Sequence, residues 1–186
     1  MSTLDAPVCA ILPCRPTPIC RPVGSEQHWN RLGRAGSYDP YLTCLAVGIW
    51  IGNLATAAAE YAAQNGFTAV LNCTHNQWAS GDVQRFNIAW KRFVIPDFKK
   101  QYNYEELMDL LNYLRLQLQP SSKRPPKLLI HCLAGRHRAA TVSAVALIAH
   151  RNFSLSAAID HIHAVRSKSH IYGSNLNWLE WAYQHL

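Results

Sequence analysis

The chain has 186 residues, of which 49% are hydrophobic and 16% are charged. These proportions are typical of one globular domain with a sizeable core, and they exclude a largely disordered chain. No apolar run reaches the length of a transmembrane segment, and the formal net charge of +7 favours anionic partners over cationic ones.

The cysteines are scattered and contain no Cys-x-x-Cys pair, which predicts neither a zinc site nor a dense disulfide scaffold. They are Cys9, Cys14, Cys20, Cys44, Cys73 and Cys132. This usage favours a reducing intracellular location, in the cytoplasm or the nucleus. Basic residues are not interleaved with stacking aromatics, so we expect no nucleic-acid partner. A solvated basic surface explains the charge equally well.

Residues 1–40 are predicted to form a loosely ordered arm. They contain Pro7, Pro13, Pro16, Pro18, Pro22 and Pro40 and show little hydrophobic periodicity. Proline removes backbone donors and restricts the residue before it, so regular structure is disfavoured here. The single folded domain is therefore expected to span residues 41–186.

Strands and helices alternate from Leu45 onward. The run Leu45–Ile51 is apolar and predicts a strand. An alanine-rich helix is predicted over Ala55–Asn65, with Gly66 at its stop. Two further strands are predicted over Phe67–Asn72 and Phe86–Ile95.

The second half continues this alternation. A helix is indicated by apolar residues at helical spacing, namely Tyr104, Leu107, Met108, Leu111 and Leu114. A linker over Pro120–Pro126 leads to a central strand, Lys127–His131, and then to a helix over Arg138–His150.

A second apolar stripe predicts another helix from Leu155, Ala158, Ile159, Ile162 and Val165. The last helix is expected to start after Gly173-Ser174, with Ser174 or Asn175 as its cap. This order predicts an α/β fold with a sheet covered by helices.

The run Leu129-Ile-His-Cys-Leu-Ala-Gly-Arg-His-Arg-Ala-Ala-Thr141 carries the chemistry. A strand ends at Cys132, a loop with Gly135 follows, and Arg138 begins a helix. Backbone N–H groups at a helix start can hold phosphate, and they also favour a thiolate over a thiol. Arg138 adds a planar guanidinium group that can donate hydrogen bonds to two phosphate oxygens. The run therefore predicts phosphoryl transfer through a cysteinyl-phosphate, without a metal or other cofactor.

Backbone N–H groups around the loop are expected to point at the phosphate oxygens. They belong to Leu133, Ala134, Gly135, Arg136, His137 and Arg138. Gly135 is needed because such a loop demands backbone conformations that a Cβ penalises. His131 is expected to support the thiolate indirectly through hydrogen bonding; a buried structural histidine is the alternative.

The segment His131-Cys132-x5-Arg138 resembles the signature of the protein tyrosine phosphatase superfamily, and its surroundings resemble the dual-specificity branch. The resemblance extends over residues 43–186. It includes the strand-like segments Ile49-Trp-Ile-Gly-Asn53 and Thr68-Ala-Val-Leu-Asn-Cys73, and a degraded Asn-x-Gly-Phe-Leu segment at Asn175-Leu-Asn-Trp-Leu179. It implies a central, mostly parallel sheet flanked by helices.

The resemblance also implies a general acid, and Asp97 occurs on the corresponding loop after Pro96. A carboxylic acid there would protonate the leaving oxygen. Asp82 and Asp109 compete for this role, but Asp82 lies in a turn-like context and Asp109 on the polar face of a predicted helix. Cys73 ends a neighbouring strand. Related phosphatases use such a cysteine as a redox partner for the nucleophile, although a buried strand cysteine is the simpler interpretation.

One position departs from the family pattern. The serine or threonine that usually follows the arginine is replaced by Ala139, so hydrolysis of the intermediate is expected to be slow unless Thr141 or Ser143 supplies a hydroxyl. The nucleophile, the arginine and the acid all remain.

The sequence therefore predicts a dual-specificity phosphatase acting on phosphorylated protein substrates, including phosphotyrosine, phosphoserine and phosphothreonine. Two alternatives stay open. Arg136 and His137 make the loop more cationic than phosphotyrosine requires, which favours phosphoinositides at an anionic lipid surface or RNA and nucleotide 5′-phosphates. The second alternative is a phosphopeptide-binding module that hydrolyses its ligand slowly. The oligomeric state does not follow from the sequence.

Overall fold

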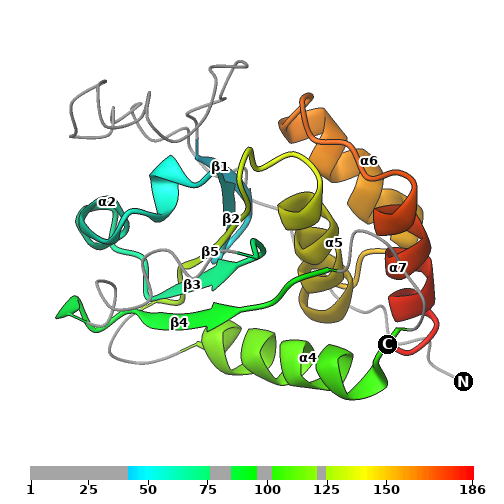
Figure 1. The fold of residues 1–186 in the computed structure, drawn as a ribbon, viewed down its shortest axis with the longest axis horizontal. Helices are drawn as coiled ribbons and strands as arrows, with labels where there is room; N and C mark the ends of the chain where they lie inside the picture. The colour runs from blue at the N-terminus through cyan, green and yellow to red at the C-terminus, as the bar shows by residue number, and fades with distance from the viewer. Residues whose placement is uncertain (1–41, 76–84, 96–101, 121–124) are drawn as a thin grey trace, which may run out of the picture.

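A five-stranded sheet forms the centre of the computed structural model, which describes residues 42–75, 85–95, 102–120 and 125–186 (Figure 1). The strands are β1 (Thr43–Ala46), β2 (Ile49–Gly52), β3 (Ala69–Asn72), β4 (Ala89–Arg92) and β5 (Leu128–His131). Their order is β1-β2-β5-β3-β4, and every neighbouring pair is parallel except β1 with β2. The predicted mostly parallel α/β fold is confirmed. The predicted arm, Asp82 and Asp97 lie outside the described residues.

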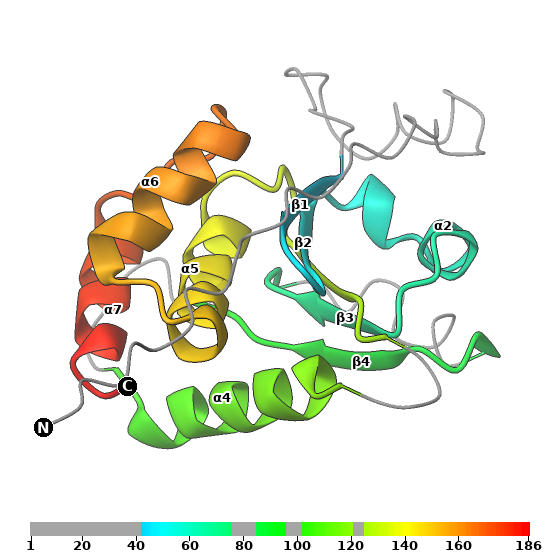
Figure 2. The same cartoon turned by 180° about the vertical axis from the view of Figure 1, so that it is seen from behind.

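Helices cover both faces of the sheet (Figures 1 and 2). One face carries α4 (Tyr104–Leu118), α5 (Arg138–Arg151), α6 (Leu155–Val165) and α7 (Ser174–Tyr183), and the other carries η1 (Ala55–Ala57) and α2 (Ala59–Gln64). Side chains on β5 alternate between them, because Leu128 and Ile130 join the larger core and Leu129 joins the smaller one. Burial on both faces explains why β3 and β5, which are buried along their whole length, are mostly apolar.

Helix α5 lies at the centre of the larger core. It contacts α4, α6 and α7 as well as β2 and β5, and every residue from Ala139 to Leu147 is buried. A helix that is apolar all round has no solvent-facing side, so its N-terminus is held rigidly against the sheet.

The predicted strand Leu45–Ile51 was wrong as one element. The structure divides it into β1 and β2, which pair antiparallel across a turn at Val47 and Gly48. Gly48 has a φ of 82°, a conformation that glycine adopts without strain, and the Val47 side chain is 65% exposed. The hydrophobic run conceals this turn because Val47 continues the apolar pattern.

Two helix predictions need smaller corrections. The stretch Ala55–Asn65 forms η1 and α2 rather than one helix, because the backbone at Ala58 leaves the helical region with a ψ of 135°. Gly66 does follow the end of α2, with a φ of 71°. Neither Ser174 nor Asn175 caps α7; Gly173 precedes the helix with a φ of 55° and no side chain caps it.

The apolar stripes are partly as predicted. On α4 the buried residues are Leu107, Leu110, Leu114 and Leu118, whereas Tyr104 at the first turn is 51% exposed. On α6 Ala158 and Ile162 are buried, and Val165 at the last turn is 43% exposed. None of the helices in the described part of the chain is long and apolar enough to cross a membrane.

Candidate active site

The predicted loop lies between the central strand and the central helix. β5 ends at His131, residues 132–137 form the loop, and α5 begins at Arg138. The N-terminus of α5 has no side-chain cap and no acidic residue in its first turn. Helices α4 and α6, in contrast, are capped by the side chains of Asn103 and Ser154. The positive end of α5 is therefore left for an anion.

Three of the loop carbonyl groups are bonded to residues outside the loop. Leu133 O accepts from Leu54 N (3.2 Å), and Gly135 O accepts from Arg166 Nε (3.1 Å) and Ser169 Oγ (3.2 Å). Arg136 O accepts from His170 N at 2.9 Å. Among the described residues, the N–H groups of Leu133, Ala134, Gly135 and His137 donate to no acceptor. A loop with occupied carbonyls and unpartnered N–H groups is suited to hold an anion.

Gly135 is required by the close packing of the loop. Its φ is 67°, and a Cβ at this position would lie 2.5 Å from Gly52 O. Any larger residue would push the loop away from the end of β2 or change its backbone conformation. The predicted need for glycine is therefore explained by both the φ angle and the contact with Gly52.

Cys132 lies at the first position of the loop, with a side chain that is 4% exposed and a free thiol. The half-buried Arg138 lies at the other end of the same loop. The Nη1 atom of Arg138 is shielded from water and has no hydrogen-bond partner in the described part of the chain. Leaving a guanidinium N–H buried and unpartnered is unfavourable. An oxyanion bound in the loop would remove that cost.

The sequence analysis missed two residues that hold the loop in place. Arg166 is 3% exposed; its Nε donates to Gly135 O, and its Nη1 donates to Thr43 Oγ1 at 2.8 Å. Ser169, 2% exposed, donates to the same carbonyl. They lie 31 and 34 positions after Gly135. In the sequence, the only indication is that the charged residue Arg166 directly follows the apolar stripe of α6. That position does not reveal which residue Arg166 contacts.

His131 is 1% exposed, and burial lowers its pKa from 6.5 to about 4, although a backbone interaction with Cys132 opposes part of the shift. The imidazole is consequently neutral at pH 7, so it supplies no full positive charge beside the sulfur. Its Nδ1 is buried and has no partner among the residues that the structure describes. Burial agrees with the alternative of a structural histidine, and support of the thiolate through hydrogen bonding stays a prediction.

Cys73 follows β3 as Cys132 follows β5. The two parallel strands pair Asn72 with His131, and Cys73 N donates to His131 O at 2.7 Å. Both cysteines belong to the same buried cluster. Burial raises the pKa of the Cys73 thiol, and the nearby Cys132 adds to the rise while Arg138 opposes it.

Neither Thr141 nor Ser143, the two residues proposed to supply a hydroxyl in place of the usual serine or threonine, has a hydrogen bond to Cys132 within the described part of the chain. Thr141 Oγ1 donates to His137 O at 3.0 Å, which is a bond within the first turn of α5. Ser143 Oγ is buried and has no partner among the described side chains and backbone groups. Ala139 itself is fully buried.

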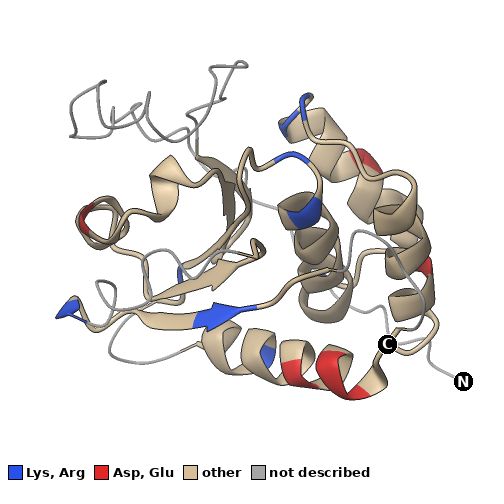
Figure 3. Ribbon diagram, in the orientation of Figure 1, with Lys and Arg blue, Asp and Glu red and all other residues tan. Residues whose placement is uncertain are grey.

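Of the three candidate acids, only Asp109 is described. It lies on α4 with an exposed carboxylate that pairs with Lys91 Nζ at 2.6 Å, which matches the predicted solvated role. Within the described ranges, no three His, Cys, Asp or Glu side chains are grouped so that they could hold a metal ion. Figure 3 shows Lys and Arg residues at the loop, at the start of α5, after α6 and on β4, whereas acidic residues lie on α2, α4, α6 and α7.

Comparison with known proteins gives the same fold and family. Residues 49–185 match the family model of the dual specificity phosphatase catalytic domain. Human DUSP28 is 21% identical, with a TM-score of 0.63 over 81% of this chain and 98% of that one. PTPMT1 is 20% identical, with a TM-score of 0.64 over 78% and 95%.

A mouse putative dual specificity phosphatase complexed with zinc tungstate is 23% identical, with a TM-score of 0.61 over 83% of this chain and 94% of that one. These solved structures share the fold, and the family model covers most of the chain. The strand, the loop and the helix that carry Cys132 and Arg138 all lie inside the matched segment. The protein belongs to the dual specificity phosphatase family.

Proposed function

We propose that this protein is a cysteine-dependent phosphatase that hydrolyses phosphotyrosine, phosphoserine and phosphothreonine in protein substrates. The observation that carries the proposal is the loop between Cys132 and Arg138. The carbonyls of Leu133, Gly135 and Arg136 are bonded outward, and the loop opens at the uncapped start of α5. The N–H groups of Leu133, Ala134, Gly135 and His137 donate to no acceptor among the described residues. A nucleophile and an oxyanion site then come from one rigid segment.

In the proposed first step, the Cys132 thiolate attacks phosphorus and the bond to the leaving oxygen breaks. Asp97 gives its proton to that oxygen. The loop N–H groups from Leu133 to Arg138 and the Arg138 guanidinium stabilise the charge on the equatorial oxygens. In the second step, water attacks phosphorus, Asp97 accepts a proton from it, and the S–P bond breaks to release phosphate and the thiolate.

Substrate specificity is tested with a panel at one ionic strength. It contains an aryl phosphate, three peptides with phosphotyrosine, phosphoserine or phosphothreonine, phosphatidylinositol 5-phosphate and an RNA 5′-phosphate. We expect the highest kcat/KM on the peptides. Turnover confined to the lipid or to RNA would contradict the protein-substrate assignment, and no turnover of any substrate would favour a phosphopeptide-binding module.

The phosphoinositide alternative is supported by a specific observation. One similar solved structure, 18% identical, is PTPMT1 in complex with PI(5)P, with a TM-score of 0.64. The half-buried Arg136 of this chain adds a second guanidinium to the loop. Charge alone does not separate a lipid headgroup from a phosphopeptide, so the panel decides.

The proposal includes a domain assignment and a location. Residues 41–186 are the expected catalytic domain, with the Pro-rich residues 1–40 as an arm outside it, and the matched segment 49–185 falls within this domain. A thiolate nucleophile works best under reducing conditions, so we place the activity in the cytoplasm or nucleus.

Ala139→Ser is expected to speed up the second chemical step. The new hydroxyl would donate to the departing thiolate, as the family residue does, and would thereby stabilise the leaving sulfur. Wild-type enzyme should show a burst of aryl alcohol followed by slow turnover, and the variant should show a smaller burst and a higher steady-state rate. An unchanged burst, with equal kcat, would mean that Thr141, Ser143 or another group already serves this purpose.

Cys73 is proposed as a redox partner of Cys132. Continuing the parallel register keeps the two positions about 4.8 Å apart between strands, within the Cα separation that a disulfide spans. Hydrogen peroxide would convert the Cys132 thiolate to a sulfenic acid; the Cys73 sulfur would then attack it, releasing water and leaving a disulfide.

This proposal predicts that activity lost to peroxide returns with dithiothreitol in the wild type. In Cys73→Ala the recovered fraction, relative to that variant's own unoxidised activity, should fall by several fold because over-oxidation is no longer blocked. Intact mass should show a loss of two hydrogens in the oxidised wild type. Full recovery in the variant, or no such mass change, would show that Cys73 is only a buried core residue.

A further inference from the structure

Aromatic rings form a continuous row where the end of α7 meets the start of α4. The ring centroids of Tyr102 and Trp181 lie 5.1 Å apart, those of Trp181 and His185 lie 4.7 Å apart, and those of His185 and Tyr104 lie 5.8 Å apart. Tyr102 and Trp181 pack against the larger core. Tyr104 and His185 are exposed, Tyr104 to 51%. The row therefore presents aromatic surface that the proposed mechanism does not use, and we call it the aromatic face.

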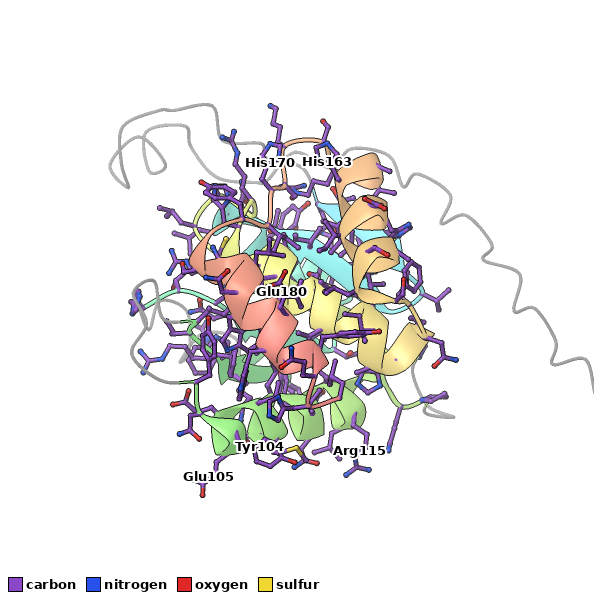
Figure 4. The ribbon with its side chains drawn as sticks, turned by 90° about the vertical axis from the view of Figure 1, so that its right-hand side faces the viewer. Tyr104, Glu105, Arg115, His163, His170 and Glu180 are labelled. Atoms are coloured by element: carbon purple, nitrogen blue, oxygen red, sulfur yellow. The ribbon has the colours of Figure 1, made fainter. Side chains whose placement is uncertain are left out.

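Carboxylates lie beside the aromatic face. Glu105 and Glu106 are exposed in the first turn of α4, and Glu180 is exposed on α7. Burial raises the pKa of the Tyr102 phenol, and the nearby Glu180 carboxylate adds to the rise. Within the described part of the chain, none of these three carboxylates forms an ion pair. Figure 4 shows Tyr104 and Glu105 at the start of α4, below Glu180 on α7. A chain with a net charge of +7 thus has an acidic aromatic surface that is suited to a cationic segment.

The Pro-rich arm contains a segment with complementary chemistry. Residues 13–22 read Pro-Cys-Arg-Pro-Thr-Pro-Ile-Cys-Arg-Pro. Closely spaced prolines favour the polyproline II helix, which has three residues per turn and no internal hydrogen bonds. In that conformation Arg15, Pro18 and Arg21 lie on one face, and the two arginines are about 19 Å apart. Polyproline segments bind aromatic-lined surfaces, and guanidinium groups bind both aromatic rings and carboxylates.

The arm is long enough to bring this segment to the aromatic face. Residues 23–42 connect it to β1 and span up to about 66 Å when extended. A folded domain of the length of residues 42–186 is about 40 Å across. Any point on its surface is therefore within reach of the arm of the same molecule. A tethered segment also acts at an effective concentration on the order of 1 mM, so even a weak contact is well populated.

We propose that residues 13–22 bind the aromatic face of the same molecule. The prolines lie against the rings, and the guanidinium groups of Arg15 and Arg21 lie beside the unpaired carboxylates. The aromatic face is then an intramolecular docking site for the arm. This inference goes beyond the proposed phosphatase function and does not depend on turnover.

The test measures binding of a fluorescein-labelled peptide of residues 11–24, with serine in place of cysteine, to the full chain by fluorescence anisotropy. In the wild type the arm already occupies the face, so the peptide should bind weakly. Arg15→Ala combined with Arg21→Ala weakens the tethered arm, and the peptide should bind this arm variant about five- to tenfold more tightly than the wild type. Equal affinity of the peptide for the two proteins would overturn the inference, and so would an absence of binding to both.

Substitutions on the aromatic face locate the bound peptide. Adding Tyr104→Ala and Glu180→Gln to the arm variant should weaken peptide binding by about five- to thirtyfold, because one ring contact and one charge contact are lost. Circular dichroism checks that the protein is folded. If Tyr104→Ala prevents folding, Glu105→Gln with Glu180→Gln leaves the rings in place and should also weaken binding. Unchanged affinity in the folded variant would place the peptide elsewhere and overturn the inference.

Glu60→Gln in the arm variant is the matched control, because it removes one exposed negative charge from α2 on the other face of the sheet. It should leave peptide binding unchanged. Weakening equal to that of the aromatic-face variant would mean that overall charge attracts the peptide, which would overturn the inference. Sedimentation velocity tests whether the contact is intramolecular. A dimer that dissociates on Arg15→Ala with Arg21→Ala would place the arm on a second copy of the chain and contradict binding within one molecule.

Discussion

Cys132→Ser is expected to abolish turnover on every phosphoester while leaving phosphate binding intact. A serine hydroxyl is not ionised at neutral pH, so the loop would hold the substrate without a competent nucleophile. The loss should be at least about 10⁴-fold in kcat, on the scale of other hydrolases that lose their nucleophile. Rapid-quench kinetics on an aryl phosphate, with labelled phosphate to detect the cysteinyl-phosphate, measure both steps.

Two measurements make this result specific to the nucleophile. Phosphate or vanadate binding should stay measurable in the variant, since the loop N–H groups and Arg138 are unchanged. Cys73→Ser is the control, because it also replaces a cysteine sulfur with oxygen, at a position that follows the neighbouring strand. It should keep measurable turnover in reducing buffer. If Cys132→Ser turns over substrate at the wild-type rate, sulfur at this position is not the nucleophile.

Asp97→Asn is expected to slow reactions with poor leaving groups far more than reactions with good ones. An alkoxide leaves slowly unless a carboxylic acid protonates it, and this help is worth about 10²–10⁴-fold. An activated aryl oxide leaves without a proton, so its hydrolysis should change little. A series of aryl and alkyl phosphates then gives a steeper dependence of kcat/KM on leaving-group basicity in the variant.

Asp109→Asn is the matched control for Asp97. Its carboxylate pairs with Lys91 on the α4 side of the sheet, so removing its charge should not change the leaving-group dependence. The wild-type kcat should also fall as pH rises through the ionisation of the acid, and Asp97→Asn should lack that fall. Equal losses on alkyl and activated aryl substrates would exclude Asp97 as the general acid and return attention to Asp82.

Much of the candidate site is readable from the sequence because its parts lie within seven positions of one another. A short apolar strand, a glycine-bearing loop and a helix that starts at Arg138 are local features, and the structure places all three where the pattern predicts. Burial on both faces of a parallel sheet also appears in the sequence as continuous apolar runs, which is why the fold class follows from the order of elements.

The predictions that failed were made where tertiary contacts override a local pattern. Val47 continues an apolar run but is exposed in the turn between β1 and β2, and Gly173 rather than Ser174 precedes α7. In both places a residue's preference was inferred from its own type, whereas the surrounding chain decides whether it is covered or bonded.

By itself the sequence determined that a cysteine and an arginine lie at opposite ends of one loop between a strand and a helix, since spacing along the chain sets that geometry. Only the tertiary structure decided how the loop is held. The contact of Gly135 with Gly52, the bonds from Arg166 and Ser169, and the approach of residues 167–172 join positions distant in the chain. Such pairings depend on strand register and helix packing, which no local pattern encodes.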